Sequence, residues 1–226
     1  MGEYYDWVNV DKRQYLDPME FGHGSKRFES WWYHDAILGA VHSLISTDWK
    51  GDHIAFIGDY AGRAKPCQNE TINRIRQQML DIYYEYDINS FYLDYYTNVS
   101  GLFKEAEEEV REEIGIILED NGTHNWYGID PANPYRGLFQ REGQFFRYVI
   151  NENRKEYYDT ERTCLLENGN KLDPLPFLVS YGEKASFDLY AGIWLGDIIS
   201  VSNKEPGYDY KDITDSHIWD YDMRDN

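Results

Sequence analysis

The sequence predicts an α+β fold in which a strand–strand–helix–strand–helix unit occurs twice in tandem. Three pairs of segments carry this repeat: 8–17 with 150–159, 24–56 with 169–201, and 96–100 with 210–214. Their order is the same in both copies, and twelve of the 48 aligned residue pairs are identical. Two copies of a small unit commonly pack about a pseudo-twofold axis. We therefore expect a pseudo-twofold pair.

The elements of the first copy follow from local patterns. Aromatic and β-branched residues predict a strand over residues 4–9 and a short hairpin partner near Tyr15. Apolar residues at mostly helical spacing predict a helix within residues 28–45, and the apolar run 54–57 predicts a buried strand. A helix over about residues 102–118 completes the unit.

The first copy also contains an insertion between Asp59 and Tyr96 that the second copy lacks. Apolar residues on one stripe predict a helix near residues 70–87 within it. The expected organisation is a first repeat over residues 1–128, with the helical insertion at about 60–95, a connecting loop over 129–143 and a second repeat over 144–226.

The second copy repeats the pattern with a shorter central helix. Two prolines within residues 172–177 disfavour a helix there. The expected elements are a strand over 145–150, a hairpin partner containing Tyr157, a helix over about 184–190, a strand over 198–201 and a last short helix within 213–222.

The composition is acidic and aromatic. The chain has 226 residues, of which 41 are acidic and 22 basic, and its formal charge is −19. Such a charge repels nucleic acid and anionic membranes and attracts basic partners. Because phosphate contacts supply most nucleic-acid affinity, direct nucleic-acid binding is not expected. Aromatic residues make up 17% of the chain, which suits a protein-recognition surface.

The sequence indicates a cytoplasmic protein without membrane association. The first residues lack the basic and apolar regions of a secretory signal. No apolar run approaches the roughly 20 residues that a membrane helix needs. Cys67 and Cys164 occupy unrelated positions of the repeat, so we expect free thiols, with a disulfide as the alternative.

The sharpest motif is Trp-x-Gly-Asp-x-Ile, which begins at Trp49 and again at Trp194. Its aspartates, Asp52 and Asp197, are the best paired carboxylates in the chain. Near a twofold axis they could bind a metal or share a proton. In the structural interpretation, Gly-Asp forms a turn, the carboxylate caps backbone amides and the tryptophan packs beneath. The motif favours this structural role.

Lys26 and Lys171 follow a glycine-containing dipeptide in both copies. Each could hold an anionic ligand or form an ion pair with the aspartate of its own unit, and the recurrence favours the ion pair. The candidate ligand-binding residues are therefore Asp52, Asp197, Lys26, Lys171, Trp49 and Trp194.

Asn9 and Asn151 precede the hairpin turn of each copy. Asparagine at such a position commonly hydrogen-bonds its own backbone. We expect both residues to stabilise their turns.

The sequence contains no recognisable catalytic or metal motif. Its six histidines lack zinc-site spacing, and none recurs in the second copy. His53, beside Asp52 with Asp59 beyond, is the one cluster that resembles a catalytic arrangement. Residues 22–26 have the wrong length for a phosphate-binding loop, and the signatures of serine and cysteine nucleophiles are missing. No catalytic residue, metal site or cofactor is therefore expected.

The charge pattern favours a binding function. Acidic stretches lie at residues 81–94, 105–113 and 209–225 and form either a solvated surface or one that meets a basic partner. The preferred function is an inhibitor- or immunity-like module that binds a basic protein through an aromatic–acidic surface. The alternatives are an enzyme or small-ligand or metal-binding protein with a site between the repeats, and a purely structural role. A lone basic patch on the insertion could dock a second copy and comprises Arg63, Lys65, Arg74 and Arg76.

Three segments resemble a group of small uncharacterised bacterial proteins. Members begin with Val-Asn-x-Asp-Lys-x-x-Tyr-Leu-Asp, continue with Trp-x-Gly-Asp-x-Ile-x-x-x-Gly-Asp and end near Tyr-x-Asp-Ile-Ser. Here these motifs are similar to residues 8–17, 49–59 and 210–214. The resemblance implies a cytoplasmic protein of bacterial or phage origin and assigns no activity to any residue.

Overall fold

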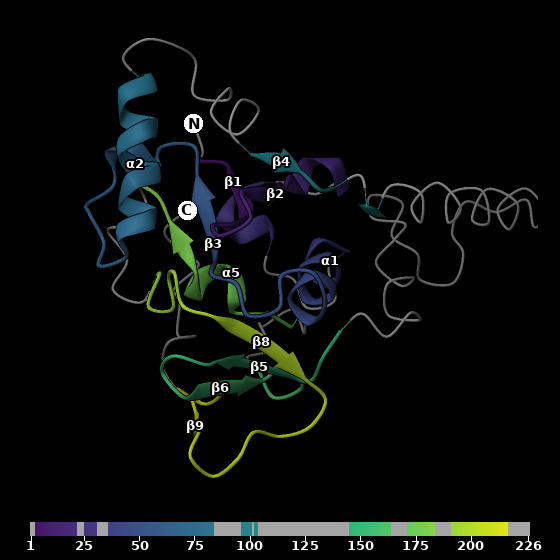
Figure 1. Ribbon diagram of the computed structural model, residues 1–226. Coiled ribbons are helices and arrows are strands. Elements are labelled where there is room, and N and C mark those ends of the chain that lie inside the picture. The colour runs from purple at the N-terminus through teal and green to yellow at the C-terminus, as the bar shows by residue number, and fades with distance from the viewer. Residues whose placement is uncertain are drawn as a thin grey trace, which may run out of the picture.

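The computed structural model describes residues 3–21, 25–30, 36–83, 96–100, 102–103, 145–163, 171–183 and 191–216. Within these residues the chain forms two β-sheets with α-helices between and beside them (Figure 1). The predicted α+β class is confirmed.

The first sheet has the strand order β4-β2-β1-β3-β7. The strands span Thr97–Asn98, Gln14–Leu16, Tyr5–Asn9, Ile54–Gly58 and Ser180–Tyr181. The central strand β1 pairs antiparallel with β2 and β3, whereas β4 and β7 are parallel additions at the two edges. The register places Val8 opposite Tyr15 on one side and Ala55 on the other.

The second sheet has the strand order β8-β5-β6-β9. Its strands span Ile199–Ser202, Tyr148–Asn151, Glu156–Asp159 and Lys211–Asp212. Here β5 pairs antiparallel with β6 and β8, and β9 is parallel to β6. Ile150 lies opposite Tyr157 and Ser200. These are the positions that the sequence alignment matches to Val8 and its neighbours. The four strands of the second sheet therefore correspond in order, direction and register to β3, β1, β2 and β4, and β7 has no counterpart among the described strands.

The two halves of the chain share one hydrophobic core. Helix α1 (Ala36–Ser46) is buried along most of its length and packs against β8 of the second sheet. In the other direction, α5 (Leu175–Leu178) leads into β7, which extends the first sheet. One cluster of buried side chains joins both sheets and both helices and includes Trp7, Ile37, Tyr158, Leu178 and Ile199. Figure 1 shows α1 and α5 between the two sheets.

The predicted helical range 28–45 contains two different helices among the described residues. The α-helix α1 spans Ala36–Ser46, and the 3₁₀ helix η2 (Arg27–Glu29) occupies the start of the range. Two further 3₁₀ helices, η1 (Pro18–Phe21) and η3 (Ala61–Arg63), were not expected. The prolines around Leu175 do not prevent helix α5, because proline is tolerated in a first turn whose N–H groups have no intrahelical partner.

The predicted helix of the insertion is confirmed as α2 (Glu70–Tyr83). Its buried residues Ile72, Ile75 and Met79 pack on the face of the first sheet that carries Val8 and Ile57. Complete burial of such a side chain contributes about 1.5–3 kcal/mol. The second sheet differs on its corresponding face. Ser200 and Ser202 stand where the first sheet has Ala55 and Ile57, and the described residues place no helix over them.

Several predicted elements fall beyond the described residues. These are the connecting loop over 129–143, the helix over 184–190, all but two residues of the helix over 102–118, residues 217–222 of the last helix, Cys164 and most of the acidic stretches over 81–94 and 105–113. Residues 213–216 form a turn.

Candidate functional site

Asp52 accepts hydrogen bonds from two side chains of the β1–β2 hairpin. Its Oδ2 lies 2.8 Å from Asn9 Nδ2 and 2.9 Å from Lys12 Nζ. The Asn9 side-chain oxygen accepts the backbone N–H groups of Asp11 and Lys12 at 3.0 and 2.8 Å. Asn9 therefore stabilises the hairpin turn, as expected, and also fixes the carboxylate.

Asp197 has the same arrangement in the second sheet. Its Oδ2 lies 2.9 Å from Asn151 Nδ2 and 2.7 Å from Arg154 Nε. The Asn151 side-chain oxygen accepts the backbone N–H groups of Asn153 and Arg154 at 3.0 and 2.9 Å. Each candidate aspartate is thus engaged by an amide and a cation of its own sheet.

The local backbone explains why glycine precedes each aspartate. Gly51 and Gly196 have φ values of +83° and +71°, in the left-handed region that glycine adopts without a Cβ penalty. The hairpin turns place Arg13 and Lys155 at φ +55° in both cases. The aspartates bind side chains, so the expectation that they cap backbone amides is wrong. Asn9 and Asn151 perform that role.

Trp49 and Trp194 are fully buried beneath these turns. The Trp49 indole N–H donates to Gln14 Oε1 at 2.8 Å, and the Trp194 indole donates to Glu156 Oε2 at 3.0 Å. Both acceptors lie at the start of the second hairpin strand. These contacts agree with the packing role and leave neither ring on the molecular surface.

The protonation of Asp52 follows from its neighbours. Burial acts to raise the pKa of its carboxyl, but hydrogen bonds from Asn9 and Lys12 outweigh it, and the pKa is lowered. The group is therefore ionised at neutral pH and does not hold a shared proton. His53 contacts Asp11 instead, with Nδ1 2.9 Å from Asp11 Oδ2. The cluster of His53 with Asp52 and Asp59 does not hold a catalytic geometry.

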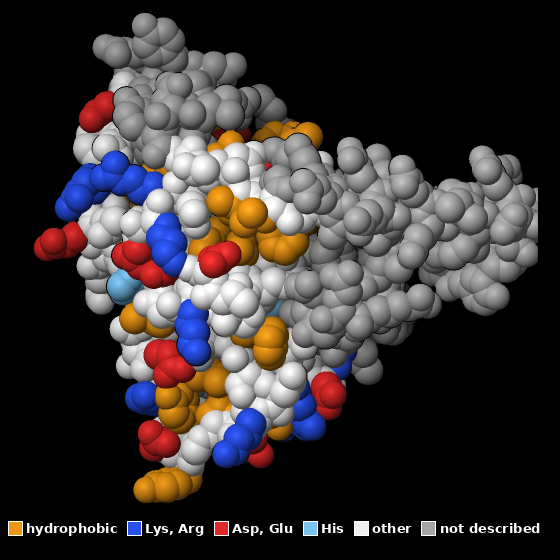
Figure 2. Space-filling view, turned by 45° about the vertical axis from the view of Figure 1, so that its right-hand side comes forward, with side chains coloured by type: hydrophobic (Ala, Val, Ile, Leu, Met, Phe, Trp, Pro, Cys, Tyr) orange, Lys and Arg blue, Asp and Glu red, His pale blue; other side chains and the backbone are white. Residues whose placement is uncertain are grey.

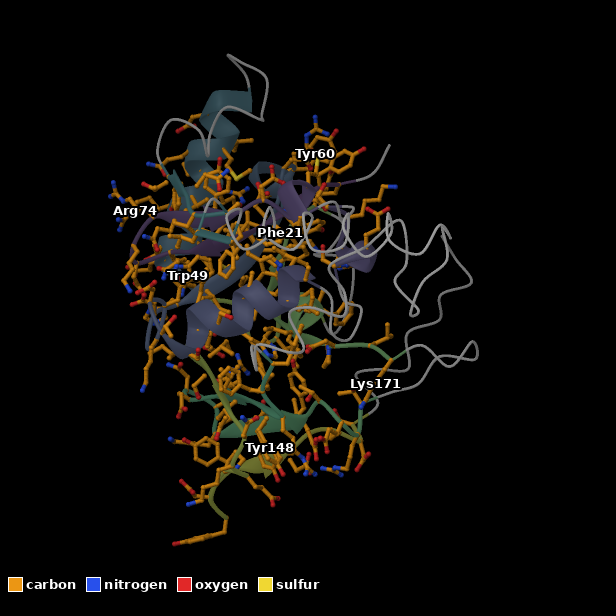
Figure 3. The ribbon with its side chains drawn as sticks, turned by 90° about the vertical axis from the view of Figure 1, so that its right-hand side faces the viewer. Phe21, Trp49, Tyr60, Arg74, Tyr148 and Lys171 are labelled. Carbon is orange, nitrogen blue, oxygen red and sulfur yellow. The ribbon has the colours of Figure 1, made fainter. Side chains whose placement is uncertain are left out.

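The expected ion pairs of Lys26 and Lys171 with the aspartates are wrong. Lys26 Nζ lies 3.5 Å from Glu29 Oε1, because an i,i+3 spacing in η2 brings them together. Burial lowers the pKa of Lys171, while the charges of Glu161, Asp159 and Asp173 oppose that shift. The cations of the two turns are Lys12 and Arg154, which occupy aligned positions of the repeat but were not among the candidate residues. Figure 3 shows Trp49 and Lys171 on different parts of the molecule.

A buried polar network at the seam was missed by sequence reasoning. His42, on α1, has Nε2 3.8 Å from Asp173 Oδ2, and both side chains are almost completely buried. Asp173 Oδ1 accepts the Tyr158 hydroxyl and the backbone N–H of Leu175. Burial lowers the pKa of His42, and the charge of Asp173 only partly offsets this. Nothing in the local sequence marks these residues, since they come from α1, β6 and the segment before α5.

A second network was also missed and joins β6 to β9. Asp159 is buried and accepts hydrogen bonds from Arg147 and Arg162, with Arg147 Nη2 at 2.9 Å. Burial acts to raise the pKa of Asp159, but these hydrogen bonds outweigh it and lower the pKa. Its backbone N–H donates to Thr214 Oγ1 at 2.9 Å, and the aligned Asp17 N–H donates to Ser100 Oγ at 3.0 Å. The last residue of the first motif therefore contacts the last residue of the third motif in both sheets.

An exposed aromatic residue lies at the far end of the second sheet. The connection between β8 and β9, residues 203–210, is named the β8–β9 arm. Within it Tyr208 is 106% exposed, and Glu205 and Asp209 are also exposed. Figure 2 shows hydrophobic, acidic and basic side chains interspersed over this end of the molecule.

The described residues contain neither a metal-binding cluster nor a membrane-spanning helix. No group of three or more His, Cys, Asp or Glu side chains there is placed to hold a metal ion. None of the helices within the described ranges has the length and apolar character that a membrane span requires.

Comparison with known proteins identifies no relative of this chain. No family model, no curated protein and no solved structure matches the chain.

Proposed function

We propose that this chain is a cytoplasmic, acidic protein-binding module of bacterial or phage origin, built from two copies of one unit. It binds a basic protein through an aromatic–acidic surface and acts by occlusion, as an inhibitor or immunity protein would. The observation that carries the proposal is the formal charge of −19 together with the internal use of basic side chains.

Matching contacts in the two halves support the duplication. The Asn9–Asp52 and Asn151–Asp197 hydrogen bonds, the two tryptophan contacts and the two strand orders correspond under the sequence alignment. His53 and Ile198 are aligned positions and form an antiparallel bridge with each other. A twofold axis between two copies pairs a residue with its own equivalent in this way. The bridge therefore supports a pseudo-twofold pair.

The distribution of charge supports a basic partner. Lys12, Arg154, Lys155 and Arg162 are engaged in ion pairs with carboxylates of the same molecule. Ion pairs at the surface contribute little stability, about 0–1 kcal/mol each, but they occupy the cations locally. The surplus of 41 acidic over 22 basic residues then sets the long-range field. Such a field accelerates encounter with a basic protein by roughly 10–10³-fold at low salt.

The alternative of a ligand or catalytic site between the repeats has weaker support. Asp52 and Asp197 precede the bridged residues His53 and Ile198, so the two turns are neighbours. Each carboxylate nevertheless has an amide donor and a cation in its own sheet. A substrate or metal would have to displace these partners. The hydrogen bonds thus favour a structural role for both aspartates.

Capture from bacterial lysate followed by a salt series tests the proposal. The protein is immobilised, bound proteins are eluted with increasing salt and identified, and each candidate is purified for calorimetry. We expect a basic protein whose dissociation constant rises steeply with salt, because a Debye length of about 10 Å at 0.1 M screens such attraction. An unrelated protein of equal net charge serves as the immobilised control.

Two results would count against the proposal. One is that every captured protein also binds the charge-matched control. The other is that the affinity of the purified candidate does not change between low and physiological salt. A candidate enzyme whose activity falls at one-to-one stoichiometry would establish occlusion.

A further inference from the structure

We infer that the β8–β9 arm, with Tyr208 at its centre, is the surface that contacts the basic partner. This inference rests on the proposed function and adds to it the binding surface and the chemistry that it recognises.

Tyr208 is the most exposed large hydrophobic side chain in the described part of the chain. It is 106% exposed, whereas Met19, Leu102 and Tyr4 are 66%, 62% and 49% exposed. Among the described residues, its hydroxyl has no hydrogen-bond partner and its ring stacks on no other ring. A tyrosine in this position contributes nothing to folding by burial, so its aromatic surface is free for a second molecule.

The base of the arm is fixed by hydrogen bonds on the β8 side. Ser202 Oγ accepts the Lys204 N–H at 2.9 Å and donates to the Lys204 carbonyl at 2.8 Å. Glu205 Oε1 accepts the Tyr157 hydroxyl at 3.0 Å, which ties the arm to the outer face of the sheet. Burial, followed by the bond to Glu205, raises the pKa of Tyr157 to about 12, so this hydroxyl keeps its proton at neutral pH.

The β9 side of the arm is fixed as well. Tyr210 donates its N–H to the Gly207 carbonyl at 3.0 Å and its hydroxyl to Glu152 Oε2 at 2.6 Å. Lys155 Nζ donates to the same hydroxyl at 2.7 Å and lies 4.5 Å from the ring centre. Tyr208 is therefore held between two anchored tyrosine contacts, and Pro206 further restricts the backbone before it.

A fixed, exposed tyrosine is well suited to be a binding hot spot. Binding loses less conformational entropy when the contacting loop is already ordered. Tyrosine supplies a large, rigid contact area with only two side-chain torsions. Tyrosine, tryptophan and arginine dominate the energetics of protein interfaces.

The charges beside Tyr208 select a cationic partner. Glu205 and Asp209 flank it on the arm, and the single arm cation, Lys204, precedes both. Asp209 is within ion-pair distance of no described cation, although its charge, after the tyrosine hydrogen bond, contributes to the raised pKa of Lys155. A guanidinium group can lie on the tyrosine ring and bind a carboxylate in the same pose, whereas an ammonium group offers a point charge only. The arm therefore fits an arginine-bearing basic surface.

The corresponding connection of the first sheet explains why only one half offers this surface. There the chain between β3 and β4 contains α2, which covers the outer sheet face. The arm is short, and no helix among the described residues covers the face that carries Ser200 and Ser202. A second copy of the chain is a poorer partner for the arm, because two molecules of charge −19 repel each other. Arg74 of α2 points away from the body and is a basic side chain that a second copy could offer (Figure 3).

Titration with a short oligo-arginine peptide, and with an oligo-lysine peptide of equal length, tests the inference on the intact protein. Amide chemical shifts report the contact residues, and fluorescence anisotropy reports the affinity. We expect shifts at residues 203–210, tighter binding of the arginine peptide, and an affinity loss of about two- to fivefold for Tyr208→Ala. Tyr4→Ala removes another exposed tyrosine and is the matched control, and Tyr208→Phe should retain binding.

The outcomes separate this inference from the proposed function. If Tyr208→Ala and Tyr4→Ala bind the arginine peptide equally, with shifts elsewhere, the arm is not the surface and the inference is wrong. If neither peptide binds at low salt, the acidic-binder proposal itself fails. If sedimentation shows a concentration-dependent dimer that Tyr208→Ala abolishes, the occupant is a second copy and the foreign partner is excluded.

Discussion

His53 and Ile198 face each other in an antiparallel β-bridge, and each directly follows the aspartate of a Gly-Asp turn. The bridge places the two turns side by side, at the seam between the two sheets, although His53 and Ile198 are 145 residues apart in the sequence. The α2 N-terminus closes the same region, since Asn69 Nδ2 donates to the Gly196 carbonyl at 3.2 Å. The seam is therefore stabilised by both halves and by the insertion.

Replacement of Asn9 or Asn151 by alanine should destabilise the protein by about 1–3 kcal/mol, because each removes backbone caps and leaves an aspartate without its amide donor. Because the His53–Ile198 bridge makes the two turns neighbours, the cost of the double variant should deviate from the sum of the single costs. Urea denaturation measures both single variants and the double variant.

The variant Asn9→Asp tests the contact between Asn9 and Asp52 directly. The variant keeps an acceptor for the turn but places a second carboxylate against Asp52, which lies 2.8 Å from the amide in the native protein. Repulsion raises the pKa of the pair in the folded state, so the variant should regain stability as the pH falls below about 5. A pH-independent loss of stability would contradict the assigned contact.

Gly51→Ala and Gly196→Ala should differ in cost although both glycines have positive φ. At Gly51 an added Cβ has no atom within 4 Å, so only the backbone penalty of about 1–2 kcal/mol applies. At Gly196 the Cβ would lie 2.3 Å from Asn69 Nδ2 and 3.0 Å from Ile72 Cδ1. Gly196→Ala should therefore be the more destabilising variant in thermal or urea unfolding. Equal costs would mean that the α2 contact does not restrain the turn.

The stability of the protein should fall as the pH drops from about 7.5 toward 5.5, through the ordinary pKa of histidine near 6.5. Burial lowers the pKa of His42 in the folded state, so the unfolded state binds more protons over this range. The stability from neutral His42 is present above the unfolded pKa and is lost below it. Nδ1 accepts the Phe146 N–H, which leaves Nε2 as the protonated nitrogen facing Asp173.

His42→Leu is the variant that assigns this pH dependence. It should show a smaller loss of unfolding free energy over the same pH interval than the native protein. Identical slopes in the two proteins would exclude His42 as the titrating group.

Glu3 and Gly182 should be coupled energetically. The buried Glu3 carboxylate accepts the Tyr5 hydroxyl at 2.7 Å and the Glu183 N–H at 2.8 Å. A Cβ at Gly182 would lie 2.4 Å from Glu3 Oε1, so Gly182→Ala must displace the carboxylate from these donors. A double-mutant cycle with Glu3→Ala measures the coupling. The double variant should cost less than the sum of the single variants, whereas simple additivity would contradict the contact.

The sequence was sufficient for the elements with strong local patterns. The apolar stripe of Ile72, Ile75 and Met79 identified α2, and alternating aromatic and β-branched residues identified β1 and β5. The turn roles of Asn9 and Asn151 were also predictable, because asparagine bonds backbone groups only two or three residues away. In these cases the interaction that stabilises the structure is local.

The sequence did not reveal the short edge strands or the cations of the aspartate turns. Strands β4 and β9 have two residues each and exist only because β2 and β6 offer parallel edges to them. The recurrence of lysine at positions 26 and 171 predicts the wrong cations, because a repeated residue type does not determine which side chains lie close together. The hairpins bring Lys12 and Arg154, rather than Lys26 and Lys171, within ion-pair distance of the aspartates.

The sequence by itself determined the α+β class, the acidic charge, the helix of the insertion and the two asparagine turns, because each depends on composition or on neighbours along the chain. The tertiary structure alone decided that α1 packs on β8, that β7 joins the first sheet and that His42 is buried beside Asp173 and Tyr158. These contacts join residues far apart in the sequence, and their free energy comes from burial that no local pattern records. The exposure of Tyr208 was also decided by the tertiary structure, because the sequence alone does not determine whether a tyrosine is buried or exposed.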